Sequence, residues 1–309
     1  MTDSYSARTS IKRAGVIAIG SNSTRLLCAD VNAALSNPVR ARQETRLFLA
    51  LSGDAAHRAQ ALPRLVEAVE ALRQTALAAG AETVRLTATA AVRDSGQQAR
   101  FAEALRQGTG LNLRVLSGEE EARYSFLGAA HPYLGEVGVV DIGGGSTELA
   151  IGSADRLNLA LSLQLGASRL YAACPMNAPG CLKPAMEQAQ SAIGDALSNL
   201  VNPPKRWLLV GGTGVALGGL IKRQVIHDAP RTDLPFTLRQ AEDALNALIA
   251  LPPHQRMELP GMTPGREHIL PTGLVILTAL MNRLNLREMA ITQRNNCDGF
   301  LYSLVDGLT

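Results

Sequence analysis

The sequence has few cysteines, no long apolar run and little excess of charge of either sign. It contains four cysteines, too few and too scattered for a disulfide framework, and no histidine stands near them to complete a zinc site: Cys28, Cys174, Cys181 and Cys297. Free thiols in a reducing cytoplasm are the simpler interpretation. No stretch approaches the roughly 18 to 20 apolar residues of a membrane-spanning helix. We therefore expect a soluble, cytoplasmic protein without a membrane partner.

The composition is that of an ordinary globular protein. Hydrophobic residues make up 46% of the 309 positions, enough apolar surface to offset the entropy of ordering, which excludes disorder over most of the chain. The net charge of +3 suits an anionic ligand but falls short of a nucleic-acid-binding protein, so we expect no nucleic-acid partner. At roughly 150 residues per domain, the length favours two domains. Residues 1–13 are polar and lack the apolar segment of a signal peptide, which indicates a disordered tail.

An internal repeat organises the sequence. Residues 15–29 align with residues 138–152, and each copy reads as two apolar strands around a turn of small residues, which predicts a β-hairpin. Two copies so far apart predict two similar domains rather than a short-period solenoid. The identical pairs are Gly15/Gly138, Val16/Val139, Ile19/Ile142, Gly20/Gly143, Ser23/Ser146, Thr24/Thr147 and Leu26/Leu149.

Helical and strand patterns alternate along the rest of the chain, which predicts an α/β protein with mixed sheets. A Pro/Gly loop at residues 131–135 marks the boundary that we expect between the two domains, 14–132 and 133–309. The last helix, at about residues 299–309, can pack back on the first domain. Helices are predicted around residues 62–80, 101–105, 122–129, 186–200, 237–252 and 274–284, and strands around residues 83–89, 113–116, 207–210 and 289–292.

The turns of the two hairpins carry the chemistry of a phosphate site. Glycine lets a phosphate approach the backbone, the turn amides form a concavity that binds anions, and Ser and Asn side chains add donors. A single turn of this kind is equally well explained as an ordinary hairpin turn, but its recurrence predicts two phosphate loops that face each other across a cleft. The predicted phosphate-binding residues are Gly20, Ser21, Asn22 and Ser23 in the first turn and Gly143, Gly144, Gly145 and Ser146 in the second.

Several charged residues stand near these turns. Asp141 ends the strand before the second turn and Glu148 lies on the return strand, so the two carboxylates can converge on one hard cation such as Mg²⁺. Turn capping and an exposed strand charge are the respective alternatives. Arg93 follows a predicted strand, where α/β sheets present ligand contacts, although a salt bridge would explain it as well. The acidic run 119–121 follows Ser117 with the spacing of a capping box, so helix capping alone accounts for it.

A third glycine-rich turn, residues 211–214, follows the predicted strand at 207–210. It lacks the full order of a dinucleotide-binding fingerprint. Its glycines can either approach a phosphate chain or allow close packing of a strand against a helix. The two interpretations stay open at this point.

Together these motifs resemble the exopolyphosphatase/guanosine pentaphosphatase (Ppx/GppA) family, which has an actin-like (ribonuclease H-like) fold. The resemblance runs along the length of the chain and is to the short, two-domain members. It rests on the order and spacing of residues 19–26, 87–94, 117–123, 141–149, 211–213, 260–266 and 271–273.

The resemblance implies two similar actin-like domains around a central cleft and hydrolysis of a terminal phosphoanhydride bond. The substrate would be inorganic polyphosphate or, as an alternative, pppGpp, a guanosine pentaphosphate that is converted to the tetraphosphate. Glu121 would be the base that activates water, and Arg93 would grip the phosphate under attack. Asp141 and Glu148 would hold Mg²⁺ or another divalent cation. The resemblance adds three residues to those that bind phosphate: Gly212, Thr213 and Arg266.

The sequence departs from the family pattern at two places that matter for activity. The family and the internal repeat both expect Asp at position 18, opposite Asp141, but this chain has Ala18, which cannot ligate a metal ion. An arginine expected near residue 297 is replaced by Cys297. A degenerate member that binds polyphosphate or (p)ppGpp as a sensor, with little turnover, is therefore an alternative to an enzyme. The sequence leaves the oligomeric state open, a homodimer included.

Overall fold

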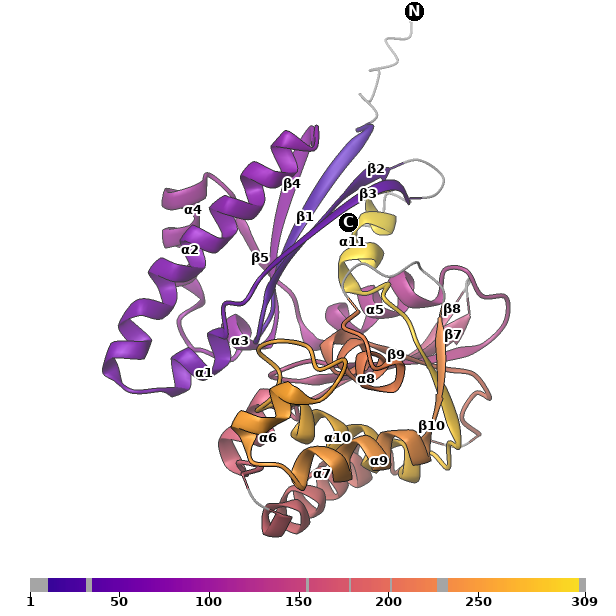
Figure 1. Ribbon diagram of the computed structural model, residues 1–309. Coiled ribbons are helices and arrows are strands. Elements are labelled where there is room, and N and C mark those ends of the chain that lie inside the picture. The colour runs from indigo at the N-terminus through magenta and orange to yellow at the C-terminus, as the bar shows by residue number, and fades with distance from the viewer. Residues whose placement is uncertain are drawn as a thin grey trace, which may run out of the picture.

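The computed structural model describes residues 11–31, 35–153, 156–177, 179–200, 202–226 and 233–305. Within these ranges the chain forms two mixed β-sheets with helices against them, so the predicted α/β class is confirmed (Figure 1). Residues 1–10 of the predicted tail lie outside the described residues. Arg13, the last residue of that predicted tail, is the first residue of a strand. No helix in the described ranges is both long enough and apolar enough to cross a membrane.

The first sheet has the strand order β3-β2-β1-β4-β5, with β1, β2 and β3 antiparallel and β4 and β5 parallel to β1. Both predicted strands that follow the hairpin, at residues 83–89 and 113–116, are present. The strands are β1 (Arg13–Ile19), β2 (Thr24–Val31), β3 (Leu35–Gln43), β4 (Thr83–Ala88) and β5 (Leu113–Val115).

The second sheet repeats this plan. Its order, β8-β7-β6-β9-β11, reproduces that of the first sheet strand by strand, and β10 extends the edge beside β11. The internal repeat of the sequence therefore extends from one hairpin to a whole sheet in each half. The strands are β6 (Val137–Ile142), β7 (Thr147–Ser153), β8 (Arg156–Leu163), β9 (Trp207–Val210), β10 (Leu234–Thr237) and β11 (Glu288–Ile291).

Helices cover both sheets. In α2, for example, Leu65, Val69, Leu72 and Ala76 recur at helical spacing and are all buried, and the Asp54 side chain caps the first turn by accepting a hydrogen bond from His57 N. The helices of the described residues are α1 (Leu47–Ser52), α2 (Ala55–Ala78), α3 (Ala90–Arg93), α4 (Gln98–Thr109), α5 (Gly118–Ala130), α6 (Ala167–Ala173), α7 (Leu182–Ala196), α8 (Gly211–Lys222), α9 (Leu238–Ile249), α10 (Leu270–Arg283) and α11 (Asn296–Val305).

Two helices pack on the sheet of the opposite half. Helix α5, which follows the first sheet in sequence, buries Ala122, Phe126 and Ala129 against strands of the second sheet. Helix α11, which follows the second sheet, buries Phe300 and Leu301 against β1 and β2 of the first. Figure 1 shows the two helices beside each other between the sheets. The domain limits at residues 132 and 133 stay predictions, because each sheet is completed by a helix from the other side of that limit.

Helices α5 and α11 touch at two glycines. A Cβ atom at Gly128 would overlap the carbonyl of Asn295, and one at Gly299 would overlap the carbonyl of Tyr124. The two backbones can approach this closely only because neither position carries a side chain.

We expect Gly299→Ala to lower the free energy of unfolding by about 1–3 kcal/mol, because the added methyl group must push α11 away from α5. Urea denaturation measures the effect. Gly194→Ala in α7 is the matched control, since no atom of the described residues lies within 4 Å of the added Cβ. The control should be as stable as the wild type or more stable by up to about 1 kcal/mol. Equal stability of the two variants would show that the helices do not depend on this contact.

Candidate active site

The two glycine-rich turns have the same internal geometry and touch each other. Gly20 N donates to Ser23 O at 3.1 Å, and Gly143 N donates to Ser146 O at 3.0 Å. A Cβ atom at Gly144 would lie 2.8 Å from the Cβ of Ser21, and one at Gly145 would lie 2.7 Å from Ser21 Oγ. The turns therefore meet where the two halves face each other, and the second turn needs glycine to fit against the first.

The carbonyl groups of both turns are bound by the helix that follows the hairpin. In the first turn, Asn22 O accepts from Arg46 N at 2.7 Å and Ser21 O from Phe48 N at 2.9 Å. In the second, Gly144 O accepts from Ser168 N at 2.8 Å. The C=O group of a trans peptide and the N–H group of the next residue point in opposite directions.

The backbone N–H groups of the turns consequently point away from these helices. No acceptor within the described part of the chain takes the N–H groups of Asn22, Ser23, Gly144, Gly145 or Ser146. Consecutive free amides of this kind form a concavity that binds anions. The turns thus have the arrangement that a phosphate site requires.

A cavity of about 60 Å³ lies between the turns. It has room for a few groups the size of water, which matches a single terminal phosphate group better than a whole substrate. The predicted site residues that line it are Gly20, Ser21, Asn22, Ser23, Glu121, Asp141, Gly143, Gly144, Gly145, Ser146, Gly212 and Arg266.

Three predicted site residues do not line this cavity. Arg93 and Glu148 lie behind its wall, where Arg93 pairs with Glu121 and Glu148 bonds Ser162. Thr213 is buried against Gly273 of α10, and its hydroxyl donates to Ile142 O at 3.4 Å. The structure therefore places Thr213 under the second turn, and its role in binding phosphate stays a prediction.

The acidic run before α5 divides between two roles. Ser117 Oγ accepts from Glu120 N at 3.1 Å, and Glu120 Oε2 accepts from Ser117 N at 2.8 Å, so the predicted capping box is confirmed. The capping box fixes where the helix begins and thereby the direction in which the side chain of Glu121, the residue after Glu120, points. Glu121 is only 6% exposed and faces the cavity. Helix capping accounts for Glu120, but not for Glu121.

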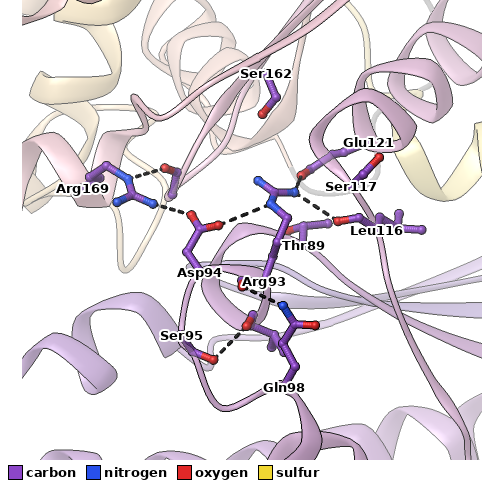
Figure 2. Close-up of polar contacts among 12 residues, drawn as sticks. Thr89, Arg93, Asp94, Ser95, Gln98, Leu116, Ser117, Glu121, Ser162 and Arg169 are labelled. Carbon is purple, nitrogen blue, oxygen red and sulfur yellow. Dashed lines mark hydrogen bonds and ion pairs between the residues drawn. The ribbon is translucent and has the colours of Figure 1, made fainter.

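Glu121 is buried and forms an ion pair with one arginine. Arg93 Nη1 lies 3.1 Å from Glu121 Oε2 and also donates to Leu116 O (Figure 2). Burial and the nearby Asp141 raise the pKa of Glu121 to about 7, although Arg93 opposes the increase. A carboxylate with this pKa is well matched to taking a proton near neutral pH.

Asp141 and Glu148 are direct neighbours across β6 and β7. Ser125 Oγ donates to Asp141 at 2.7 Å, and Ser162 Oγ donates to Glu148 at 2.7 Å. Burial raises the pKa of both carboxyl groups, and for Glu148 the charges of Glu121 and Asp141 add to the effect. Glu148 Oε2 is buried and has no hydrogen-bond partner among the described residues.

The donor chemistry of this pair suits a magnesium ion at Asp141, which lines the cavity, with Glu148 beside it across the hairpin. Mg²⁺ is commonly bound by one or two carboxylates together with phosphate oxygens, so two protein ligands are sufficient. The described residues contain no group of three or more His, Cys, Asp or Glu side chains arranged around a metal ion. A cation at Asp141 would therefore depend on the substrate for further ligands.

Sequence reasoning missed Arg25, which lines the cavity. The register pairs Ala18 with Arg25 in the first hairpin, as it pairs Asp141 with Glu148 in the second. The repeat thus puts an arginine where the other half has a carboxylate, a signal that was present in the alignment. Among the described residues Arg25 has no hydrogen bond or ion pair, so its cation is free to meet an anion.

A second cavity, of about 600 Å³, adjoins the first and shares Arg25, Gly211 and Gly212 with it. Three more arginines from β3 and the loop after it line this cavity: Arg40, Arg42 and Arg46. Arg266 packs over Gly212 between the cavities, and burial, with Arg25 and Arg42 nearby, lowers the pKa of Arg266 to about 9. The larger cavity therefore offers a basic path into the smaller one.

Comparison with known proteins was made by sequence and by structure. The model of a family described as the Ppx/GppA phosphatase family matches residues 29–307. Exopolyphosphatase 1 of Mycobacterium leprae (strain TN) is 28% identical over 289 residues, which cover 90% of this chain and 85% of that protein. A guanosine-5'-triphosphate,3'-diphosphate pyrophosphatase of Aliivibrio fischeri (strain MJ11) is 27% identical over 300 residues. The match covers 94% of this chain but only 59% of the Aliivibrio protein.

Solved structures share the fold. An exopolyphosphatase from Cytophaga hutchinsonii superposes with a TM-score of 0.83 at 20% identity, covering 96% of this chain and 99% of that one. A Ppx/GppA family member from Aquifex aeolicus gives a TM-score of 0.77 at 22% identity, covering 96% and 98%. At these identities the similarity shows a common fold, and the predicted α/β class with two mixed sheets is confirmed.

We expect Glu121→Gln to be stabilised relative to the wild type as pH rises from about 5 to about 8 in the presence of a chelator. A carboxyl group whose pKa is raised by folding stabilises the protein while it is protonated, and this stabilisation is lost as pH rises through the folded pKa of about 7. Glutamine does not titrate. The difference in unfolding free energy should grow by up to about 3 kcal/mol in urea titrations. A difference that does not change with pH would contradict the pKa shift.

Proposed function

The chain belongs to the Ppx/GppA phosphatase family, and from this we propose that it hydrolyses terminal phosphoanhydride bonds of inorganic polyphosphate and releases orthophosphate. One observation carries the proposal: two turns direct their free amides toward a phosphate-sized cavity that also exposes the buried carboxylate of Glu121. The names of the relatives, an exopolyphosphatase and a pppGpp pyrophosphatase, indicate the same class of reaction.

In the proposed mechanism the two turns bind the terminal phosphate through their N–H groups. The carbonyls of the turns are already bonded to the segments around α1 and α6, so the amides are oriented before the substrate enters. Preorganised donors stabilise the charge that develops on phosphate oxygens without a reorganisation cost during the reaction. Arg25 and Arg266, which line the same cavity, add positive charge.

Glu121 acts as the general base. It takes a proton from a water molecule, the water oxygen forms a bond to the terminal phosphorus, and the bridging P–O bond breaks. Arg93 keeps Glu121 oriented and offsets part of its charge. Orthophosphate and a chain shortened by one phosphate are the products.

Asp141 would hold the divalent cation, with Glu148 beside it across the hairpin. When bound, the cation would neutralise phosphate oxygens and so favour attack by water. Two observations support this assignment: Glu148 Oε2 has no partner among the described residues, and burial raises the pKa of both carboxyl groups. A cation would bind the oxygen and would offset the buried negative charge.

The larger cavity supports polyphosphate as the substrate. Its described lining residues include four arginines and no aromatic ring on which a guanine base could stack. Arg40 pairs with Asp298 and Arg42 with Glu44, which also lines the cavity. Repeated phosphates suit such a lining. Hydrolysis of pppGpp remains the alternative within the family, and Ala18 favours a third candidate, a polyphosphate or (p)ppGpp sensor with little turnover. Phosphate release from long-chain polyphosphate and from pppGpp, each with Mg²⁺ and with a chelator, distinguishes the three.

We expect Glu121→Gln to lower kcat for phosphate release by about 10²–10⁴-fold, because the variant cannot take the proton of water. Glu120→Gln is the matched control: Glu120 lies one residue away, caps the helix and pairs with Arg114 outside the cavity, so the kcat of this variant should stay at the wild-type value. Steady-state release of phosphate from polyphosphate measures both. Wild-type turnover in Glu121→Gln would refute the assignment of the base.

We expect Ala18→Asp to lower the Mg²⁺ concentration required for activity. The new carboxylate would face the cavity beside Asp141 and give the cation a third anionic ligand. In the metal-free cleft its cross-strand neighbour Arg25 would offset part of the repulsion from Asp141. The measurement is phosphate release against Mg²⁺ concentration, with Asp141→Ala as the negative control. Full activity of Asp141→Ala at low Mg²⁺ would mean that the cation binds elsewhere.

A further inference from the structure

A chain of charged side chains connects the second glycine-rich turn to Glu121 (Figure 2). Arg169 Nη2 lies 2.6 Å from Asp94 Oδ2, and Arg93 Nε lies 3.4 Å from the other oxygen of Asp94. Arg93 then pairs with Glu121. Arg169 stands in α6 of the second half, whereas Asp94, Arg93 and Glu121 precede the second sheet. The chain therefore crosses between the halves beside the cavity.

Arg169 fixes the second turn at its last carbonyl. Its Nε donates to Gly145 O at 2.7 Å, and no other donor in the described ranges reaches that carbonyl. The guanidinium also lies over the ring of Phe48, 5.1 Å from its centroid. Because C=O and the following N–H point in opposite directions, this bond directs the amide of Ser146 away from Arg169. Within the described ranges no arginine side chain donates to a carbonyl of the first turn.

Asp94 is shared between two arginines. One oxygen accepts from Arg169 and the other faces Arg93, whose Nη1 is divided between Glu121 and Leu116 O. Without Arg169, Asp94 would keep Arg93 as its sole cation in this network. The attraction between them would then draw the guanidinium away from Glu121.

We propose that Arg169 is a positioning residue for hydrolysis: it orients the Ser146 amide through Gly145 and keeps Arg93 on Glu121 through Asp94. The inference rests on the proposed function, since it concerns the step in which Glu121 acts. Arg169 touches neither the water nor the phosphate in this account. It also makes the alignment of Glu121 depend on contact between the two halves, because Asp94 and Phe48 belong to the first half and Gly145 to the second.

The test is a double-mutant cycle of Arg169→Met and Asp94→Asn, with polyphosphate as substrate and saturating Mg²⁺. Met keeps much of the length of the side chain but removes both bonds. We expect each single variant to lose about 10–100-fold in kcat while KM stays within about 3-fold, because a displaced base slows the chemical step more than it weakens binding. The double variant should be no slower than Arg169→Met within about 3-fold, since both changes break the same chain.

Arg114→Met is the matched control. It breaks an ion pair of 2.8 Å with Glu120, next to the same helix but outside the cavity, and its kcat should equal that of the wild type. Arg169→Lys retains the charge but cannot bond Asp94 and Gly145 at the same time as the planar guanidinium does. Its kcat should lie between those of the wild type and Arg169→Met. It also serves if Arg169→Met fails to fold.

Three results would overturn the inference: wild-type kcat in folded Arg169→Met, a loss expressed wholly in KM, or additive losses in the cycle. If the wild type is active and Glu121→Gln is inactive, each of these results refutes only the role of Arg169 and leaves the proposed function standing. A wild type that releases no phosphate from polyphosphate or pppGpp refutes the proposed function and this role with it.

Discussion

The contact between two glycine-rich turns, one from each sheet, is the interaction on which the rest of the site depends. The second turn can carry no side chain at this contact, because Ser21 of the first turn fills the space that a Cβ on Gly144 or Gly145 would take. With the carbonyls bonded on the outer side, the amides are left to the cavity. The sheets, and the helices α1 and α6 that follow the third strand of each, can be understood as supports that hold this contact in place.

The site is also where the fold carries its largest electrostatic strain. Glu121, Asp141 and Glu148 are all buried: the charge of Asp141 raises the pKa of Glu121, and the charges of both raise the pKa of Glu148. Arg93 is the only cation that forms an ion pair with one of them in the described ranges. Such an arrangement opposes folding and is typical of places where a bound cation or a proton transfer needs it. The serines at positions 125 and 162 relieve part of the strain by donating to Asp141 and Glu148.

The sequence predicted the parts of the molecule that are local or repeated. The hairpins, the capping box at Ser117 and the facing turns follow from short patterns whose physics is contained in a few residues. The role of Glu121 did not follow in this way, since the same residues satisfied helix capping, and only burial separates it from Glu120. The contact of Arg169 with Asp94 spans 75 positions, and no periodicity or motif indicates it. Thr213 and Glu148 were predicted for the site from their motifs, but neither lines the cavity. A motif identifies a candidate residue without showing whether its side chain reaches the cavity.

The exchange of α5 and α11 between the sheets bears on the order in which the protein can fold as it is synthesised. Strands β1 and β2 are synthesised long before α11, the helix that packs on one of their faces and ends at Val305. The first half supplies only part of the cover for that apolar face, from Leu116, Tyr124 and Leu127, because most of the buried side chains of α5 pack on the other sheet. The core on this face is therefore completed only when α11 has been made, so the first half does not finish folding independently of the second.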